Sequence, residues 1–369
     1  MNNQAPHIII SGGGTGGHVF PAIAIAHALK NINPDTQILF VGARGRMEMQ
    51  KVPDAGYRII GLPVAGIQRR LTWKNLMVPF KLIRSLSMSA RIIRDFKPDV
   101  VVGVGGYASG PVLRVAGRKG IPMLIQEQNS YAGVTNRLLA AKASKICVAY
   151  EGMEQYFPGE KIELTGNPVR EELIPDSDKK QQALHHFGLS DGMKTILVIG
   201  GSLGARSINL SIIEHLQEFE QNRVQLIWQC GKHYHQQAME AMSPYSLPHV
   251  RLMDFIDRMD LAYAAADLII SRAGAGTISE LALVKKPVIL VPSPNVAEDH
   301  QTRNARSLSD RNAAILVRDE DARYELINKA LGVLENEEQS RALSDHIAQI
   351  AKPDSAQKIA EEVIKLTTS

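Results

Sequence analysis

A histidine directly after a run of glycines is the first residue here whose type and position could do chemistry. Gly12, Gly14 and Gly17 form a Gly-x-Gly-x-x-Gly pattern, and His18 follows it. Such glycines permit a tight turn and close approach of the backbone to a ligand. Histidine has an unperturbed pKa of about 6.5, which suits a general base near neutral pH. A residue that only orients the loop fits the same position, so both roles stay open.

Two further glycine loops, in the second half of the chain, suit a nucleotide diphosphate. Segments 200–202 and 274–277 each follow an apolar run and precede a helical pattern. Helix N-termini offer N–H groups and positive partial charge, so anions bind well there. We expect Glu280 in the first turn after the second loop, where it would interact with the helix dipole or accept hydrogen bonds from ribose hydroxyls. The chain has no Gly-Lys-Ser/Thr P-loop, which disfavours phosphoryl transfer from ATP.

The elements that must position these loops occur twice. Apolar runs at 8–10 and 196–199 open the two halves, and similar runs at 100–102 and 268–270 recur later in each half. Each run leads through a glycine turn into a helical pattern, as expected of a buried parallel strand in an α/β protein. The repetition predicts two doubly wound, Rossmann-like domains that face a cleft.

Length and charge also indicate two domains. A chain of 369 residues exceeds what one core usually serves. Residues 1–165 carry 20 Lys and Arg against 10 Asp and Glu, a net charge of +10, whereas the remaining residues hold 22 against 28, a net charge of −6. This difference suggests distinct partners for the two halves, although chance variation of the surface would also produce it. We place the boundary at residue 165/166, within a segment punctuated by glycine and proline.

The composition excludes several classes of protein. An apolar fraction of 44% with 22% charged residues rules out disorder, and two distant cysteines provide no disulfide framework or metal spacing. No run approaches 18 apolar residues, so we expect no membrane-spanning helix. The chain has no Asp-x-Asp motif, and its histidine pairs lie in polar contexts. We therefore predict no obligate metal and no cofactor.

A basic amphipathic stretch at 68–97 suits peripheral contact with a membrane. It carries eight Lys and Arg against one acidic residue, interleaved with apolar residues at helical spacing. The alternative is that the apolar stripe is core, which we prefer for Ile92 and Ile93. The residues that we expect at an anionic membrane surface are Trp73, Met77, Phe80, Lys81 and Arg84. No recognised nucleic-acid motif accompanies the stretch, so we expect no nucleic-acid partner.

Two other functions remain as alternatives. The first glycine loop formally matches the dinucleotide fingerprint, which also expects an acidic residue at the end of the second strand. Here the strand at 38–41 ends in Gly42-Ala43-Arg44 without a carboxylate, although Arg44 could meet a 2′-phosphate. An NADP-dependent oxidoreductase is therefore the second hypothesis. A protein that binds a nucleotide sugar without catalysis is the third.

Taken in order, the motifs resemble the MurG family of N-acetylglucosaminyltransferases over nearly the whole chain. They lie at 13–21, 105–107, 127–129, 165–170, 200–202 and 279–281. The resemblance implies a GT-B fold, with an acceptor- and membrane-binding domain at 1–165 and a UDP-GlcNAc-binding domain at 166–349. It implies that a final helix at about 350–369 packs back on the first domain. The implied reaction is inverting transfer of GlcNAc from UDP-GlcNAc to the muramyl 4-hydroxyl of lipid I, which forms lipid II in peptidoglycan synthesis.

The resemblance also implies residue roles and a location. His18 is the candidate base and Glu127 its competitor, whereas Gln126 departs from a frequent family histidine and can take no proton. The expected substrate contacts are Thr15, Gly16, Gly17, Asn129, Arg170, Ser202, Ile256, Ala275, Gly276, Thr277, Ile278, Ser279, Glu280 and Gln301. Of these, Arg170 and Ser202 match family positions near the diphosphate. Ile256 matches the uracil-binding position and Glu280 the ribose-binding position. Asn129 and Gln301 match positions that contact the sugar. The implied location is peripheral, on the cytoplasmic face of the bacterial inner membrane, with polyprenyl-linked lipid I as substrate and other cell-wall enzymes as candidate partners.

Overall fold

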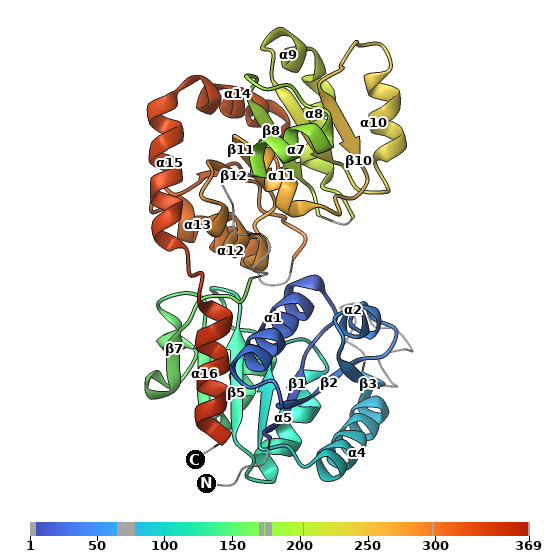
Figure 1. Ribbon diagram of the computed structural model, residues 1–369, viewed down its shortest axis with the longest axis vertical. Helices are drawn as coiled ribbons and strands as arrows, with labels where there is room; N and C mark the ends of the chain where they lie inside the picture. The colour runs from blue at the N-terminus through green and yellow to red at the C-terminus, as the bar shows by residue number, and fades with distance from the viewer. Residues whose placement is uncertain are drawn as a thin grey trace. The chain divides into compact units, whose positions relative to one another are not determined.

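The computed structural model describes residues 5–64, 78–169, 173, 179–201, 203–296 and 299–367. The chain divides into two compact units, one of Met1–Arg170 with Lys352–Ser369 and the other of Glu171–Ala351 (Figure 1). Each unit holds one parallel sheet with helices on its faces. The prediction of two doubly wound α/β units is confirmed.

The first sheet has the order β3-β2-β1-β4-β5-β6-β7. Its strands are β1 (His7–Ser11), β2 (Gln37–Ala43), β3 (Arg58–Leu62), β4 (Val100–Gly103), β5 (Met123–Glu127), β6 (Lys145–Val148) and β7 (Ile162–Leu164). The order reverses between β1 and β4, so a topological switch point lies at the carboxyl ends of these two strands. Ligands of open α/β sheets bind at such a switch point.

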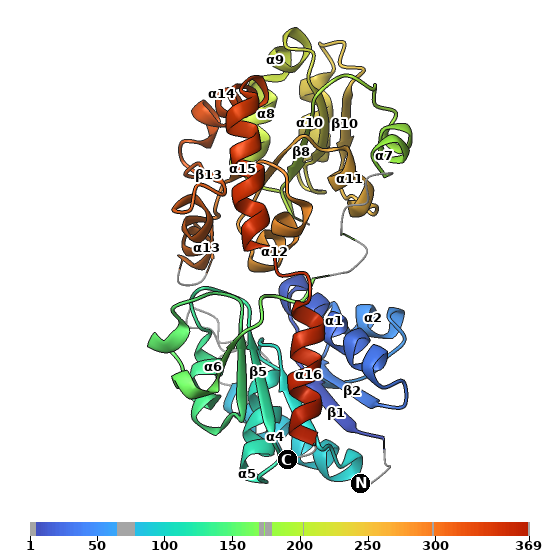
Figure 2. The same cartoon turned by 60° about the vertical axis from the view of Figure 1, so that its left-hand side comes forward.

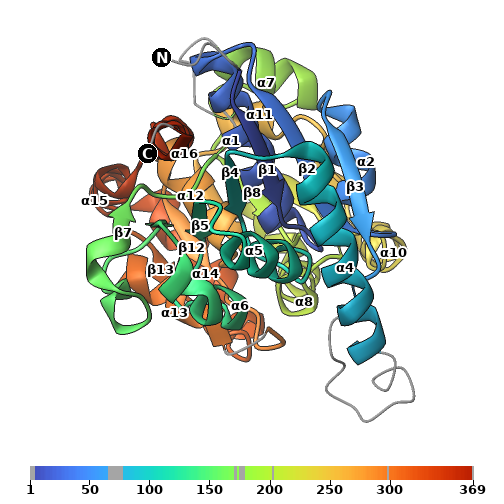
Figure 3. The same ribbon diagram turned by 90° about the horizontal axis from the view of Figure 1, so that it is seen from below.

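Helices cover both faces of the first sheet because successive strand residues point to opposite sides. Ile9 packs with Ile92 and Ile93 of α4 (Val78–Phe96), and α5 (Ser109–Arg118) lies beside α4 on the same face (Figure 3). Ile8 and Ile10 pack on the other face with α1 (Gly16–Ile32). The prediction that Ile92 and Ile93 belong to the core is confirmed. Two further α-helices in the described part of this unit are α2 (Glu48–Asp54) and α6 (Val134–Leu139).

The last helix, α16 (Ser355–Thr367), belongs to the first unit and lies beside α1 (Figure 2). Its buried residues Ile359 and Val363 join the same cluster as Ile8 and Ile10. Lys145 of β6 pairs with Glu362 at 3.5 Å and with Glu163 at 3.1 Å. Apolar burial therefore holds α16, and the Lys145–Glu362 ion pair adds a contact between this helix and β6.

The second sheet has the order β10-β9-β8-β11-β12-β13 and reverses between β8 and β11. Its strands are β8 (Thr195–Ile199), β9 (Gln225–Gln229), β10 (Val250–Met253), β11 (Leu268–Ser271), β12 (Val288–Leu290) and β13 (Ile315–Leu316). The helices are α7 (Lys179–Phe187), α8 (Arg206–Glu214), α9 (Leu216–Gln221), α10 (His235–Met242), α11 (Met259–Ala265), α12 (Ala275–Val284), α13 (His300–Ser309), α14 (Ala322–Glu335) and α15 (Glu337–Ile350). Helices α8 and α9 are separated by a single residue, His215.

The duplication extends to single side chains. Asp99 precedes β4 and accepts a 2.7 Å hydrogen bond from the backbone N–H of His7, where β1 begins. Asp267 precedes β11 and accepts a 2.9 Å hydrogen bond from the backbone N–H of Thr195, where β8 begins. In each unit an equivalent aspartate therefore connects, by a hydrogen bond, the starts of the two strands that flank the switch point.

Candidate functional site

The loops after β1 and β4 interlock at the switch point of the first unit. Gly106 has φ +83°, and a Cβ placed on it would lie 2.2 Å from the carbonyl oxygen of Gly13. Since that neighbour is backbone, no side-chain rotation relieves the clash. Only glycine at position 106 lets these two loops touch. This contact fixes the loops that flank His18.

His18 lies in the first turn of α1 between the two loops. Its Nδ1 is 3.1 Å from Oγ1 of Thr15, the N-cap residue of α1. A Cβ on Gly105 would lie 2.9 Å from His18 Nε2, so only glycine at this position lets the backbone of the β4 loop approach the imidazole so closely. If Nδ1–H donates to Thr15, Nε2 is unprotonated and can accept a proton. Gly16 and Gly17 lie in the same first turn.

A buried carboxylate that the sequence analysis missed holds the first glycine loop. Glu48 of α2 is 1% exposed, and its Oε2 accepts a 3.0 Å hydrogen bond from the N–H of Gly14. Its Oε1 accepts a 2.9 Å hydrogen bond from the N–H of Ala43, at the end of β2. The strand itself ends without a carboxylate, as the sequence shows, but the chain returns to this strand end through α2 and places Glu48 there. Glu48 therefore occupies one of the N–H donors of the glycine loop.

Glu127, the competing candidate base, is buried under four donors. Its Oε1 accepts hydrogen bonds from the backbone N–H and side-chain amide of Asn129, at 3.0 and 3.3 Å. Its Oε2 accepts hydrogen bonds from the N–H of Gly133 and the amide of Asn136, both at 2.9 Å. These contacts organise the loop from β5 to α6 and stabilise the charged carboxylate.

An amide network ties that loop to the β4 loop and to the end of the first unit. Gln126 donates to Asn167 Oδ1 at 2.9 Å, and Asn167 donates to the carbonyl oxygen of Gln128 at 3.0 Å. Gln128 donates to the carbonyl oxygen of Val104 at 2.8 Å. Asn167 is thus built into the first unit, which explains why the unit ends after Arg170 and not at residue 165.

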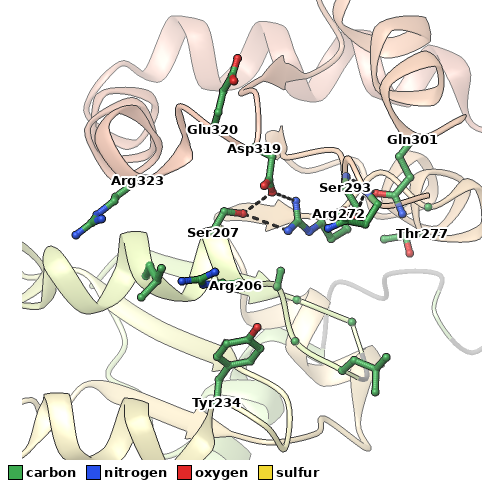
Figure 4. Close-up of a pocket in the computed structure, with 18 residues that line it drawn as sticks. Arg206, Ser207, Tyr234, Arg272, Thr277, Ser293, Gln301, Asp319, Glu320 and Arg323 are labelled. Carbon is green, nitrogen blue, oxygen red and sulfur yellow. Dashed lines mark hydrogen bonds and ion pairs between the residues drawn. The ribbon is translucent and has the colours of Figure 1, made fainter. Parts of the chain in front are cut away.

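The second unit carries a pocket of about 730 Å³ at its own switch point (Figure 4). The pocket lies at the carboxyl ends of β8, β11 and β12 and reaches the N-termini of α8 and α12. Its lining includes Gly200, Gly201, Gly204, Arg206, Ser207, Tyr234, Arg272, Gly274, Thr277, Ser293, Gln301, Asp319, Glu320 and Arg323. The size and the two helix termini suit a ligand with an anionic part.

The close approach of two loops shapes the floor of this pocket. Gly204 has φ +79°, and a Cβ there would lie 2.1 Å from the carbonyl oxygen of Cys230. The buried amide of Asn209 donates to that same oxygen at 2.8 Å, and the indole N–H of Trp228 donates to Asn209 Oδ1 at 2.9 Å. Asn209 and Trp228 therefore hold the Cys230 carbonyl against which Gly204 of the glycine loop packs.

Of the residues expected to contact the donor, Thr277 and Gln301 line the pocket. Gln301 Oε1 accepts a 2.9 Å hydrogen bond from the N–H of Ser293. Glu280 lies in the second turn of α12, not the first as expected, because the helix begins at Ala275. Its carboxylate accepts a 3.0 Å hydrogen bond from the hydroxyl of buried Tyr263.

Five further expected donor contacts lie on α12 or in the loop before α11. Ala275 and Ile278 are buried, and Ser279 donates its hydroxyl to the carbonyl oxygen of Ala275 at 3.1 Å. Gly276 lies in the first turn of α12. Ile256 is 2% exposed, so its side chain is packed inward. Arg170, Ser202, Trp73 and Met77 lie outside the described residues.

The described residues contain no group of three or more His, Cys, Asp or Glu side chains arranged to hold a metal ion. Burial raises the pKa of the Cys147 thiol to about 12 and that of Cys230 to about 11. Both thiols are therefore protonated near neutral pH and are poor nucleophiles.

The start of α4 exposes large apolar side chains beside basic ones. Phe80 is 68% exposed and Ile83 66% exposed, and Leu82 and Arg84 are exposed as well. Lys81 is half-buried. Within the described part of the chain, none of the helices combines the length and apolarity that a membrane span requires.

The comparisons with known proteins agree over nearly the full chain. Residues 8–148 match the glycosyltransferase family 28 N-terminal domain, and residues 195–362 match its C-terminal domain. A UDP-N-acetylglucosamine--N-acetylmuramyl-(pentapeptide) pyrophosphoryl-undecaprenol N-acetylglucosamine transferase of Bacteroides fragilis is 60% identical over 98% of this chain and 96% of its own length. The enzyme of the same name from Flavobacterium psychrophilum is 53% identical over 98% of both chains.

A solved structure extends the agreement to three dimensions. The crystal structure of Acinetobacter baumannii MurG matches with a TM-score of 0.78 and 30% identity, over 98% of this chain and 99% of that one. The chain therefore belongs to glycosyltransferase family 28 and, within it, to the MurG family of N-acetylglucosamine transferases.

Proposed function

We propose that this protein is an inverting glycosyltransferase that moves GlcNAc from UDP-GlcNAc to the muramyl 4-hydroxyl of lipid I and so forms lipid II. The names of its relatives describe this transferase activity. The structural observation that carries the proposal is the pocket at the carboxyl edge of the second sheet, where two helix N-termini meet. A pocket of this kind suits a nucleoside diphosphate sugar.

The donor proposal assigns each end of UDP-GlcNAc to a part of the second unit. The diphosphate lies at the N-termini of α8 and α12, with Ser202 contributing as the family resemblance implies. Glu280, oriented by Tyr263, accepts the ribose hydroxyls. Because the Ile256 side chain is buried, uracil is recognised there through backbone N–H and C=O groups. Gln301 meets a hydroxyl of GlcNAc.

The reaction itself is a single displacement at the anomeric carbon of the α-linked donor. The acceptor oxygen forms a bond to that carbon as the bond to the phosphate oxygen breaks, so the product is β-linked and UDP departs. The hydroxyl proton passes to Nε2 of His18, in the tautomer whose Nδ1–H donates to Oγ1 of Thr15. Fixed N–H donors stabilise the charge that develops on UDP.

The environment of the first glycine loop argues against the NADP-dependent alternative. Glu48 already accepts the N–H of Gly14 and its other oxygen accepts the N–H of Ala43. This loop donor is therefore occupied and does not bind a dinucleotide pyrophosphate, and the carboxylate is held by backbone at both oxygens.

Transfer of labelled GlcNAc from UDP-GlcNAc to a lipid I analogue tests the proposal directly. We expect β-linked product in buffer that contains a metal chelator, because the proposal needs no metal. Isothermal titration should show binding of UDP and none of NADP. Binding of UDP without transfer would favour a non-catalytic nucleotide-sugar-binding protein, and loss of single-turnover rate in the chelator would overturn the metal-independent mechanism.

We further propose that the start of α4 docks the protein peripherally on the anionic cytoplasmic face of the inner membrane, where lipid I is held. The support is the exposed pair Phe80 and Ile83 beside Arg84 and Lys81. Apolar side chains can enter the headgroup region while each basic residue contributes about 1 kcal/mol near an anionic surface.

Replacing Phe80, Lys81 and Arg84 together with alanine should weaken sedimentation with anionic vesicles by at least about tenfold, since two basic residues and one exposed ring are lost. Leu138→Ala is the control, because Leu138 is also an exposed apolar residue of the first unit but lies on α6. Unchanged binding of the triple variant would refute this surface as the membrane contact.

A further inference from the structure

Four loops of the second unit converge on one arginine in the donor pocket. Arg272 directly follows β11, and its Nη1 donates to the carbonyl oxygens of Val291 and Pro292, beyond β12, at 3.0 and 3.3 Å. Nη1 also donates to Asp319 Oδ1, in the loop after β13, at 2.5 Å. Nη2 donates to Oγ of Ser207, in the first turn of α8, at 3.1 Å.

Arg272, Ser207 and Asp319 are hydrogen-bonded to one another in a cluster that is partly shielded from water. Ser207 donates its hydroxyl to Asp319 Oδ1 at 2.5 Å, so Arg272, Ser207 and Asp319 form a triangle (Figure 4). The side chains of Arg272 and Asp319 are 17% and 28% exposed. A guanidinium can hold several acceptors in a fixed geometry, which a lysine cannot reproduce.

The carboxylate of Asp319 lies in an unexpected place for a site that binds a diphosphate. It lines the pocket, and by charge alone it would repel an anionic ligand. Arg272 compensates its charge, but the pair then adds no net attraction for phosphate. Positioning of the surrounding loops explains the arrangement better than simple electrostatic attraction.

We propose that Arg272, held by Asp319 and Ser207, is a positioning residue that sets the geometry of the diphosphate-binding end of the pocket. This inference rests on the proposed function. Arg272 stands three residues before the first residue of α12, Ser207 is in the first turn of α8, and Pro292 precedes Ser293, whose N–H meets Gln301. One side chain therefore links both helix N-termini and the loop that holds Gln301.

The sign of the change in UDP affinity separates positioning from charge. We expect Asp319→Asn in the full chain to raise the Kd for UDP by roughly tenfold, as loss of a charge-assisted hydrogen bond at a partly shielded site predicts. The Kd for uridine, which lacks phosphates, should hardly change. A binding site governed only by net charge would instead bind UDP more tightly once the carboxylate is removed.

Glu320→Gln provides the matched control. Glu320 lines the same pocket and loses the same charge, but it is 72% exposed and pairs with exposed Arg318. We expect UDP binding by this variant to be as tight as, or tighter than, that of the wild type. Ser207→Ala, which removes one corner of the triangle, should weaken UDP binding less than Asp319→Asn and serves as the second variant if Asp319→Asn does not fold.

Three readouts decide the outcome. Weaker UDP binding with intact uridine binding and an intact thermal transition supports the proposal. Tighter UDP binding by Asp319→Asn, or equal weakening of UDP and uridine binding, overturns it. Failure of the wild-type protein to bind UDP would count against the proposed function itself and is read from a separate titration.

Discussion

His18→Ala is expected to lower kcat by about 10²–10⁴-fold, the usual contribution of a positioned general base. KM for UDP-GlcNAc should change little, because the donor is assigned to the second unit and His18 belongs to the first. The imidazole is held between Thr15 and the side-chain-free position at Gly105. In the tautomer whose Nδ1–H donates to Thr15, Nε2 is the nitrogen that takes the proton.

The pH dependence of kcat provides the decisive measurement. The wild-type profile should fall on the acid side as the imidazole becomes protonated, and His18→Ala should lose that limb. Thr15→Val should lower kcat less, since it removes only the group that selects the tautomer. His27→Ala is the control, because His27 lies on the same helix but is exposed and packs against Tyr57. Wild-type kcat at all pH values in His18→Ala would exclude His18 as the base.

Glu127→Gln is expected to reduce kcat by roughly 10–100-fold while keeping the acid limb of the pH profile. The carboxylate accepts four hydrogen bonds from the loop that carries Asn129 and Asn136. A glutamine places an NH2 group against these donors, so at least one contact is lost. The free energy of unfolding should fall by about 1.5–3 kcal/mol, as for other hydrogen bonds to charged groups.

The alternative role for Glu127 makes a different prediction. If Glu127 were the base, Glu127→Gln would lose the acid limb and His18→Ala would keep it. Asn136→Ala removes one donor and no candidate base, so an organising role predicts a smaller loss of kcat with an unchanged pH profile. Full activity in Asn136→Ala together with a lost limb in Glu127→Gln would contradict the organising role.

Much of the fold follows from local patterns in the sequence. The apolar runs at 8–10 and 196–199 are buried on both faces, which only a parallel sheet between helices provides. Each run ends at glycines, and a helix follows, so the strand–loop–helix units could be predicted twice over. The burial along α4 was also predicted in part, since Ile92 and Ile93 were assigned to the core and Phe80 to an exposed surface.

The position of Glu280 shows the limit of local reasoning about a candidate site. The sequence gives the number of residues between the glycine loop and Glu280, but it does not give the residue at which α12 begins. That start, at Ala275, places Glu280 one turn deeper, where Tyr263 reaches it from another helix. Helix boundaries depend on capping and on packing, which a single segment does not specify.

By itself the sequence determined two α/β units, their glycine loops and the family to which the chain belongs. Only the tertiary structure decided which side chains hold those loops. Glu48 returns to the end of β2 through a helix, and Ser207 meets Asp319 from 112 positions away in the sequence. The physical reason is that strand order brings these residues to one carboxyl edge. That order arises from packing of the whole sheet, whereas the sequence pattern records only each strand's own burial.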